Sequence, residues 1–407
     1  MTGGLLRRTA LTVCAFSSWL LITACNGGST PVSPTPPQAI APAGPNVIPI
    51  TVNLGPLGVA DNIAYTSVTI CVPGTTTCQT IDGIQLDTGS SGLRILSSAL
   101  SLPLPSETDA SGHPIVECLQ FVASYSWGSV RIADAQLSGE QAHGIPVQVI
   151  GDPQFPAVPD SCSSTGPSAD TVETFGANGL LGVGVFRQDC GSACSVAGGA
   201  NTNMYFTCPN TPCQTIAVSL AQQVVNPVWM FSSDNNGVIV ELPPVATTGQ
   251  ATASGSLVFG IGTQSNNALG TATALTTDLD GLFPTVYNGR SYSGSIFDTG
   301  SDALYFLDSR TAGLALCPDA NYYYCPATPQ NQTATVQGLN GKAGAVSFQV
   351  ASADTLFANS VLSAFSNLAG PNPGQFDWGL PFFYGRNVFV GIESQSTPAG
   401  FGPFWAF

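Results

Sequence analysis

The pattern of apolar positions divides the chain into a leader, a segment without periodicity and a long body. The leader has the basic pair Arg7-Arg8 followed by an apolar run over residues 10–22, which is the layout of a secretory signal. Residues 26–46 are rich in proline and have no periodic apolar pattern, so we expect an extended tether there. From Val47 onward, short apolar or alternating runs are separated by Gly, Pro, Asn and Asp, which is typical of strands and turns.

The fold class predicted for the body is mainly β, with a few helices. Five runs have the strand pattern most clearly, namely residues 66–71, 84–86, 147–150, 238–242 and 256–259. Such runs recur too often for the regular alternation of strands and helices in an α/β protein. Two stretches, residues 215–225 and 353–368, have apolar positions at helical spacing, and we predict helices there.

The end of the leader predicts the location of the protein. Residues 21–25 (LITAC) resemble the bacterial lipobox, in which the cysteine is lipidated and becomes the new N-terminus. We therefore expect a signal peptide over residues 1–24 and a palmitate-bearing Cys25 that opens a tether over residues 25–47. An ordinary cleaved signal with a chance cysteine is the alternative. Asn26 follows Cys25, and by the same resemblance it favours the outer membrane, with this lipid as the sole membrane contact.

The cysteines indicate an oxidising compartment. The chain has twelve cysteines, and ten remain when Cys14 in the leader and Cys25 are set aside. An even number of cysteines in an exported chain indicates disulfides. The spacings predict the pairs Cys71–Cys78, Cys118–Cys162, Cys190–Cys194, Cys208–Cys213 and Cys317–Cys325. A crossed arrangement among the four cysteines at 190, 194, 208 and 213 is equally allowed by the sequence. We expect no metal site, because zinc needs clustered ligands in a reducing compartment.

Charge and rare residues exclude several functions. The chain has 9 Lys+Arg against 24 Asp+Glu, a formal charge of −15, so we expect no binding of nucleic acid. Lys342 is its single lysine, and His113 and His143 are its two histidines. Two histidines are too few for a histidine-rich metal site and leave few candidates for the histidine of a Ser-His-Asp triad. No glycine-rich phosphate loop opens a helix, and we expect no cofactor.

A repeated tetrapeptide is the most informative feature. Asp87-Thr88-Gly89-Ser90 and Asp298-Thr299-Gly300-Ser301 are identical, and each follows the apolar end of a predicted strand. A single copy would be an ordinary Asx turn. Two copies at matching strand ends instead predict a duplicated lobe with a shared site, with one lobe over residues 48–236 and the other over residues 237–407.

Two aspartates from such a repeat can hydrolyse an amide. Carboxylates held a few ångströms apart share one proton, because both cannot ionise cheaply. The ionised member can then deprotonate a water molecule, while the protonated member donates to a substrate carbonyl oxygen. Glycosidases also use two carboxylates, at separations of about 5 to 9.5 Å, but without a repeated Thr-Gly-Ser frame. We therefore take Asp87 and Asp298 as the candidate catalytic pair.

With this pair in place, the sequence resembles the bilobal pepsin-like aspartic proteases. The resemblance covers residues 48–407 and rests on ordered landmarks besides the tetrapeptides: segments 124–129, 177–184, 219–242, 255–262 and 376–390. It implies a cleft between two β-rich lobes, an extended peptide or protein as substrate, and a helix within 219–242 leading into the inter-lobe strand. We also expect a monomer. The chain is similar, in addition, to a group of proteobacterial lipoproteins with two Asp-Thr-Gly-Ser motifs.

The resemblance implies a role for each residue of the repeat. Thr88 and Thr299 would form hydrogen bonds across the lobes. Ser90 and Ser301 would bond the outer carboxylate oxygens. Gly89 and Gly300 would let backbone amides approach the inner carboxylate oxygens. Tyr125 matches the tyrosine that closes over the bound peptide. The alternative for Tyr125 and Trp127 is an exposed hairpin whose aromatic faces are buried.

Three positions depart from the family pattern. Arg94 stands where a tryptophan is usual, Trp127 where a small hydroxyl residue is common, and Asp302 where Ser or Thr often contacts the substrate. Asp302 would raise the pKa of neighbouring carboxyl groups unless a cation such as Arg94 pairs with it, and we hypothesise that pair. Two functions follow: an envelope-anchored aspartic endopeptidase or, alternatively, a catalytically silent lipoprotein that binds a protein or polysaccharide in its cleft.

Overall fold

The structure, a computed structural model, describes residues 40–196, 203–210 and 212–407. The predicted signal peptide, Cys25 and the tether up to residue 39 lie outside the described residues. The described part of the predicted tether, residues 40–47, is docked: the backbone N–H of Ala41 donates to Glu241 Oε2 at 2.6 Å, and the Ser256 hydroxyl donates to the Ala41 carbonyl at 2.7 Å. In the part of the chain that is described, no helix has the length and apolar character needed to cross a membrane.

Most of the described strands belong to one fifteen-stranded sheet. Its spatial order is β10-β9-β5-β6-β7-β4-β8-β3-β2-β1-β12-β11-β21-β24-β13. The bounds are β1 Val47–Val52, β2 Ala64–Cys71, β3 Cys78–Asp87, β4 Ser91–Leu96, β5 Ile115–Gln120, β6 Tyr125–Leu137, β7 Glu140–Ile150, β8 Gly179–Val183, β9 Tyr205–Thr207, β10 Gln214–Thr215, β11 Gly237–Leu242, β12 Ala253–Phe259, β13 Ala274–Thr276, β21 Arg386–Gly391 and β24 Phe404–Ala406.

A second sheet is built from the C-terminal half alone. Its order is β18-β17-β14-β15-β20-β16-β19, with bounds β14 Phe283–Tyr287, β15 Arg290–Phe297, β16 Leu304–Leu307, β17 Gln330–Gln337, β18 Ala343–Val350, β19 Ala369–Gly370 and β20 Asn372–Trp378. Alternation explains its strands: Phe283, Thr285 and Tyr287 of β14 are buried, and the residues between them are partly exposed. A separate hairpin pairs β22 Ser396–Thr397 with β23 Gly400–Phe401.

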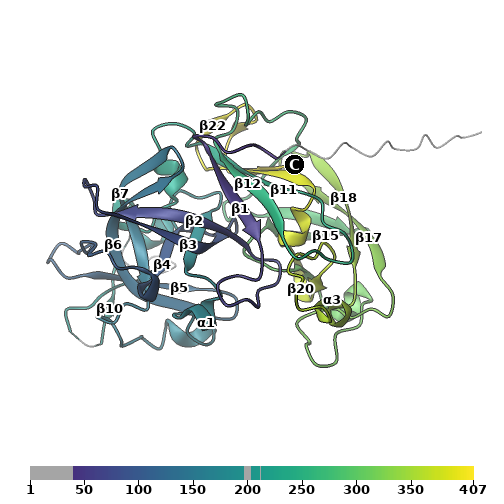
Figure 1. Cartoon of the computed structure of the whole chain (residues 1–407), viewed down its shortest axis with the longest axis horizontal. Helices are drawn as coiled ribbons and strands as arrows, with labels where there is room; N and C mark the ends of the chain where they lie inside the picture. Colours follow the sequence, from purple (N-terminus) through teal and green to yellow (C-terminus); the bar gives the residue numbers. More distant parts are fainter. Residues whose placement is uncertain (1–39, 197–202, 211) are drawn as a thin grey trace, which may run out of the picture. The chain divides into compact units, whose positions relative to one another are not determined.

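The two halves of the chain meet in the large sheet. β1 pairs antiparallel with β12 over all six of its residues, while Thr51 and Val52 also pair with β2. Figure 1 shows β1 alongside β12 and β11. The mainly β prediction is therefore confirmed, and all five predicted strand runs lie within strands.

The helices are shorter than predicted. The described chain has α1 Val172–Phe175, α2 Ser309–Ala312 and α3 Ala353–Phe357, together with the 3₁₀ turns η1 Ser97–Ala99, η2 Ser163–Thr165, η3 Gly191–Cys194, η4 Leu220–Gln222, η5 Pro227–Met230 and η6 Leu380–Phe382. The predicted helix over 215–225, which was to lead into the inter-lobe strand, is wrong, because this segment contains only the last residue of β10 and the turn η4. That segment is rich in β-branched residues, which disfavour helix.

The second predicted helix, residues 353–368, is wrong beyond its first turns. α3 ends at Phe357, and the following backbone pairs with a distant segment instead of with itself. The N–H of Ser363 donates to the Gln250 carbonyl, and the N–H of Gln250 donates to the Ala364 carbonyl, both at 2.9 Å. Tertiary hydrogen bonds thus replace the helical ones.

The five predicted disulfides are formed. They join Cys71–Cys78, Cys118–Cys162, Cys190–Cys194, Cys208–Cys213 and Cys317–Cys325. The crossed arrangement among the cysteines at 190, 194, 208 and 213 is therefore excluded. Cys118–Cys162 closes the longest loop, with a sequence separation of 44, and ties β5 to the segment that precedes α1.

Candidate active site

The two Asp-Thr-Gly-Ser motifs meet where β3 and β15 end. Asp87 is the last residue of β3, and Asp298 directly follows β15. Each strand lies in the same local arrangement: β3 is parallel to β8, which is antiparallel to β4, and β15 is parallel to β20, which is antiparallel to β16. The repeat seen in the sequence is therefore a repeat of three-stranded units.

Four hydrogen bonds between the threonines and the backbone lock the two motifs together. The N–H of Thr88 donates to Thr299 Oγ1, and the N–H of Thr299 donates to Thr88 Oγ1, both at 3.0 Å. The Thr88 hydroxyl donates to the Phe297 carbonyl and the Thr299 hydroxyl to the Leu86 carbonyl, both at 2.8 Å. Both threonines are buried, so these bonds fix the spacing of the adjacent aspartates.

Glycine and serine hold the carboxyl groups in place. The N–H of Gly89 donates to Asp87 Oδ1, and the N–H of Gly300 donates to Asp298 Oδ1, both at 2.7 Å. The Ser90 hydroxyl donates to Asp87 Oδ2, and Ser301 Oγ lies 2.9 Å from Asp298 Oδ2.

The glycines are required by the closeness of the two carboxyl groups. A Cβ on Gly89 would lie 2.6 Å from Asp298 Cγ, and one on Gly300 would lie 2.7 Å from Asp87 Oδ1. Any side chain at these positions would push the aspartates apart. The structure thus brings together all eight residues of the repeat.

The electrostatics of the pair place a proton on Asp298. Burial, followed by repulsion from Asp377 and Asp87, raises the pKa of Asp298 well above its usual range. Asp298 also shares a hydrogen bond with Asp87, and one shared proton is what two adjacent carboxyl groups require.

A cavity of about 690 Å³ opens over the pair, which is within the usual range for ligand sites. Asp87 and Asp298 lie in its wall, together with residues 121–124 at the turn of the β5–β6 hairpin and the apolar side chains of Leu180 and Phe186. A second cavity of about 480 Å³ adjoins it and shares the lining residues Ile63, Gln85, Phe175, Gly300 and Ser301. The second cavity therefore extends the available space along Gly300 and Ser301 of the second motif.

Tyr125 and Trp127 do not line the cavity, contrary to the expectation that Tyr125 closes over a peptide. Both belong to a buried cluster beside the Cys118–Cys162 disulfide, and the Trp127 indole N–H donates to the Phe155 carbonyl at 2.8 Å. Residues 125 and 127 point to the same face of β6 because side chains alternate along a strand. Phe121 and Val122 border the cavity instead.

The hypothesised pair of Arg94 and Asp302 is wrong. Arg94 is completely buried, and its Nη2 lies 2.7 Å from Glu117 Oε1 and 2.8 Å from Asp189 Oδ2. Burial opposes the charge on Arg94, but these two carboxylates outweigh it and raise its pKa. The ion cluster ties β4 to β5 and to the segment after β8, since the side chains come from all three.

Asp302 is bonded by two tyrosines instead. The Tyr305 hydroxyl donates to Asp302 Oδ1 at 2.6 Å, and the Tyr323 hydroxyl donates to Oδ2 at 2.5 Å. Burial still raises the pKa of Asp302, although both tyrosines oppose the shift. Asp302 lies in the second cavity with Asp61, whose pKa is raised to about 6 by burial and then by Asp302.

Asp377 is a site residue that the sequence reasoning missed. It lies on β20, and Ser301 Oγ is 2.6 Å from its Oδ2. Burial and then the charges of Asp87 and Asp302 raise its pKa to about 7. The signal was present in the sequence: Asp377 precedes Trp378-Gly379 just as Leu180 precedes Leu181-Gly182. A carboxyl group is unexpected between two large aromatic residues such as Phe376 and Trp378, which are both buried.

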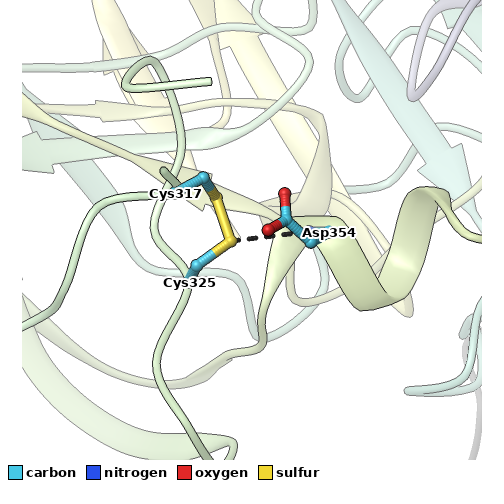
Figure 2. Close-up of side chains that lie close together, drawn as sticks. All are labelled: Cys317, Cys325 and Asp354. Carbon is cyan, nitrogen blue, oxygen red and sulfur yellow. Dashed lines mark hydrogen bonds between the residues drawn. A yellow bond between two sulfur atoms is a disulfide. The ribbon is translucent and has the colours of Figure 1, made fainter. Parts of the chain in front are cut away.

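One group among the described residues has the spacing of a metal site, but its chemistry does not fit one. Cys317, Cys325 and Asp354 bring ligand atoms within 4.8 Å of one another. Figure 2 shows that the two sulfurs are bonded to each other, with the Asp354 N–H directed at Cys325 Sγ at 3.5 Å. Since metals bind thiolates and a disulfide offers none, this group serves to attach the disulfide to the start of α3.

Comparison with known proteins agrees with this architecture. Residues 42–407 match the model of a family described as "Protein of unknown function (DUF3443)". Among solved structures, the chain is similar to the aspartic proteinase from Irpex lacteus, with a TM-score of 0.52 and 13% sequence identity over 88% of this chain and 96% of that one. The fold is therefore that of the pepsin-like aspartic proteinases. No curated protein sequence matches the chain.

Proposed function

The chain belongs to the family of proteins of unknown function DUF3443, and we propose that it is an aspartic endopeptidase that cleaves peptide bonds through Asp87 and Asp298. The observation that carries the proposal is the pair itself. Two carboxyl groups share a hydrogen bond in the wall of a cavity, and buried threonines fix their spacing.

The chemistry follows from the unequal protonation of the pair. Ionised Asp87 accepts a proton from a water molecule, whose oxygen attacks the scissile carbonyl carbon. Protonated Asp298 donates to the carbonyl oxygen and stabilises the tetrahedral intermediate. The carbon–nitrogen bond then breaks as the leaving amine takes up a proton from the dyad. No covalent intermediate forms and no cofactor is required.

The substrate in this proposal is an extended peptide or an unfolded protein. The two adjoining cavities run along Gly300 and Ser301, so a chain can lie across the dyad with side chains on both sides. The formal charge of −15 favours approach of cationic substrates and repels nucleic acid. We further propose that the lipid on Cys25 holds a monomer at the bacterial cell envelope, at the outer membrane.

A binding lipoprotein without catalysis is the second candidate, and the position of Tyr125 favours it. With Tyr125 packed against the Cys118–Cys162 disulfide, no tyrosine of the β5–β6 hairpin stands in the cavity wall among the described residues. A cleft that recognises a protein or polysaccharide needs the shape of the cavity but no proton transfer.

Cleavage of an unfolded protein between pH 3 and pH 7 separates these two functions. Residues 26–407 would be compared with Asp87→Asn and Asp298→Asn, which keep the shape of each carboxyl group. We expect peptide release by the wild type and a loss of about 10⁴-fold in each variant, which is the upper range for general acid–base catalysis. A statine-type transition-state mimic should also block the wild type.

The matched control is Asp280→Asn, which changes an exposed aspartate away from the cavity and should leave the rate unchanged. Circular dichroism checks that every variant is folded. If the folded wild type releases no peptide at any pH, the endopeptidase proposal is overturned and the binding function takes its place.

A further inference from the structure

Ser301 contacts two carboxyl groups but has one proton to give. Its Oγ lies 2.9 Å from Asp298 Oδ2 and 2.6 Å from Asp377 Oδ2. A serine hydroxyl is a single donor, so it cannot bond two ionised carboxylates at once. One of the two carboxyl groups must therefore carry a proton and donate it to Ser301 Oγ.

The surroundings of Asp377 identify it as that donor. Asp298 uses its own proton toward Asp87, within the dyad. Asp377 Oδ1 is buried and has no hydrogen-bond partner among the described residues. An ionised Asp377 would leave a buried charge with a single hydrogen bond, whereas a neutral Asp377 leaves only an uncharged oxygen unpaired, which costs much less.

No cation compensates for a charge at this position. The ionisable groups that face Asp377 are Asp87 from β3, Asp298 from the end of β15 and Asp302 before β16. Its cross-strand neighbour on β16 is Tyr305, which donates to Asp302. Within residues 40–196, 203–210 and 212–407, none of these four carboxyl groups has an ion pair with Arg, Lys or His.

We propose that Asp377 is a proton-holding positioning residue: in its neutral form it donates to Ser301 and thereby commits the Ser301 hydroxyl to Asp298. The chain Asp377–Ser301–Asp298 keeps the outer oxygen of Asp298 bonded while its inner oxygen serves the dyad. The catalytic consequence rests on the proposed endopeptidase function, whereas the proton on Asp377 does not.

The raised pKa of Asp377, about 7, agrees with this arrangement. When Asp377 loses its proton, the Ser301 hydroxyl must turn to one carboxylate or the other, and a second negative charge appears beside the dyad. Activity should then fall as the pH rises through this titration. Three interacting carboxyl groups titrate together, so the alkaline limb of the pH profile reports on the cluster.

Two variants of Asp377 test the role in catalysis. Asp377→Asn retains a neutral donor that cannot ionise, and Asp377→Leu installs the side chain that Leu180 supplies at the equivalent position of the other half. On a peptide substrate, we expect Asp377→Asn to keep kcat within about threefold of the wild type and to move the alkaline limb upward by half a pH unit or more. Asp377→Leu should lower kcat about tenfold with KM within about twofold.

A structural role alone would give a different result. Asp377→Asn would then have the wild-type pH profile multiplied by a constant, and that outcome overturns the positioning role. Asp280→Asn serves again as the control that should leave both kcat and the profile unchanged.

Infrared spectroscopy tests the proton without any turnover. The C=O stretch of protonated carboxyl groups would be compared in wild type and Asp377→Asn at pH 5 and pH 9. We expect the wild type at pH 5 to have one more protonated carboxyl group than the variant, and that band should vanish by pH 9. Identical spectra would overturn the inference even in an active enzyme. An inert wild type with the extra band would overturn the endopeptidase function alone.

Discussion

The two halves of the site have the same backbone and different neighbours. In the first half, β8 lies between β3 and β4. Its Leu181 pairs with Leu86 of β3, and its Leu180 pairs with Arg94 of β4. In the second half, β20 lies between β15 and β16. Its Trp378 pairs with Phe297 of β15, and its Asp377 pairs with Tyr305 of β16. Arg94 and Tyr305 are therefore equivalent positions, and so are Leu180 and Asp377.

The difference lies in how each half neutralises buried charge. The first half places its acids, Glu117 and Asp189, around the cation of Arg94. The Tyr205 hydroxyl also donates to Asp189, whose pKa is raised by burial and by Glu117, so the feature that distinguishes this half is the cation. The second half has no such cation in the described chain, and its acids are protonated or bonded by tyrosines, as at Asp377 and Asp302. The repeated tetrapeptide fixes where the two catalytic carboxyl groups lie, while the neighbours determine which one carries the proton.

Breaking the cation of the first half should have the largest effect. Arg94→Leu leaves Glu117 and Asp189 buried without a countercharge, which typically destabilises a protein by about 3–5 kcal/mol. The equivalent change in the second half, Tyr305→Phe, removes one donor to Asp302 while Tyr323 remains. That loss should be about 1 kcal/mol. Guanidinium denaturation at pH 6 measures both free energies of unfolding.

Neutralising the two acids checks the cause. Adding Glu117→Gln and Asp189→Asn to Arg94→Leu should restore part of the lost stability, because no unpaired charge is then buried. If Arg94→Leu and Tyr305→Phe cost the same, the two halves do not differ in the way described.

What the sequence could predict was local or repeated. Three disulfides were predictable from spacing and parity, whereas the pairing among the cysteines at 190, 194, 208 and 213 was left open. The geometry of Asp87 and Asp298 followed from a tetrapeptide that appears twice. The partners of Arg94 were not predictable, because Asp189 is 95 residues away and only the folded sheet brings it near. The predicted helix after residue 357 failed for a similar reason, since backbone pairing with Gln250 outweighs a local preference.

Asp377 should also make the second half sensitive to pH. Its pKa rises from 3.8 to about 7 on folding, so between these values the folded state holds a proton that the unfolded state has lost. The proton bound by Asp377 therefore contributes fully to the free energy of unfolding below pH 3.8, and this contribution is lost as the pH rises toward 7. The stability of the wild type relative to Asp377→Asn should therefore fall by roughly 3–4 kcal/mol between pH 4 and pH 8.

Denaturant unfolding at half-unit pH steps measures this difference. Acids outside this cluster titrate equally in both proteins, so the subtraction reports on Asp377 together with Asp298, whose pKa Asp377 helps to raise. Parallel stability curves for the two proteins would show that Asp377 ionises at the same pH whether folded or not.

The serines provide the finest comparison between the halves. Ser90 donates to Asp87 alone, whereas Ser301 lies between Asp298 and Asp377. Ser301→Ala removes the single hydrogen-bond partner that Asp377 has in the described chain, and a buried polar group without a partner costs about 1–3 kcal/mol. Ser90→Ala should cost about 1 kcal/mol or less, because the N–H of Gly89 still bonds Asp87.

The double variant Ser301→Ala/Asp377→Leu identifies where the extra cost of Ser301→Ala arises. With the carboxyl group gone, Ser301→Ala leaves nothing unpaired beside it, so the double variant should be more stable than Ser301→Ala alone. A double-mutant cycle over these two positions should give a coupling of about 1–2 kcal/mol, within the range for side chains in contact. The matching cycle in the first half, Ser90→Ala with Leu180→Ala, should give a coupling near zero, because Leu180 offers the serine neither a donor nor an acceptor. Equal couplings in the two halves would mean that Ser301 and Asp377 do not act as a bonded pair.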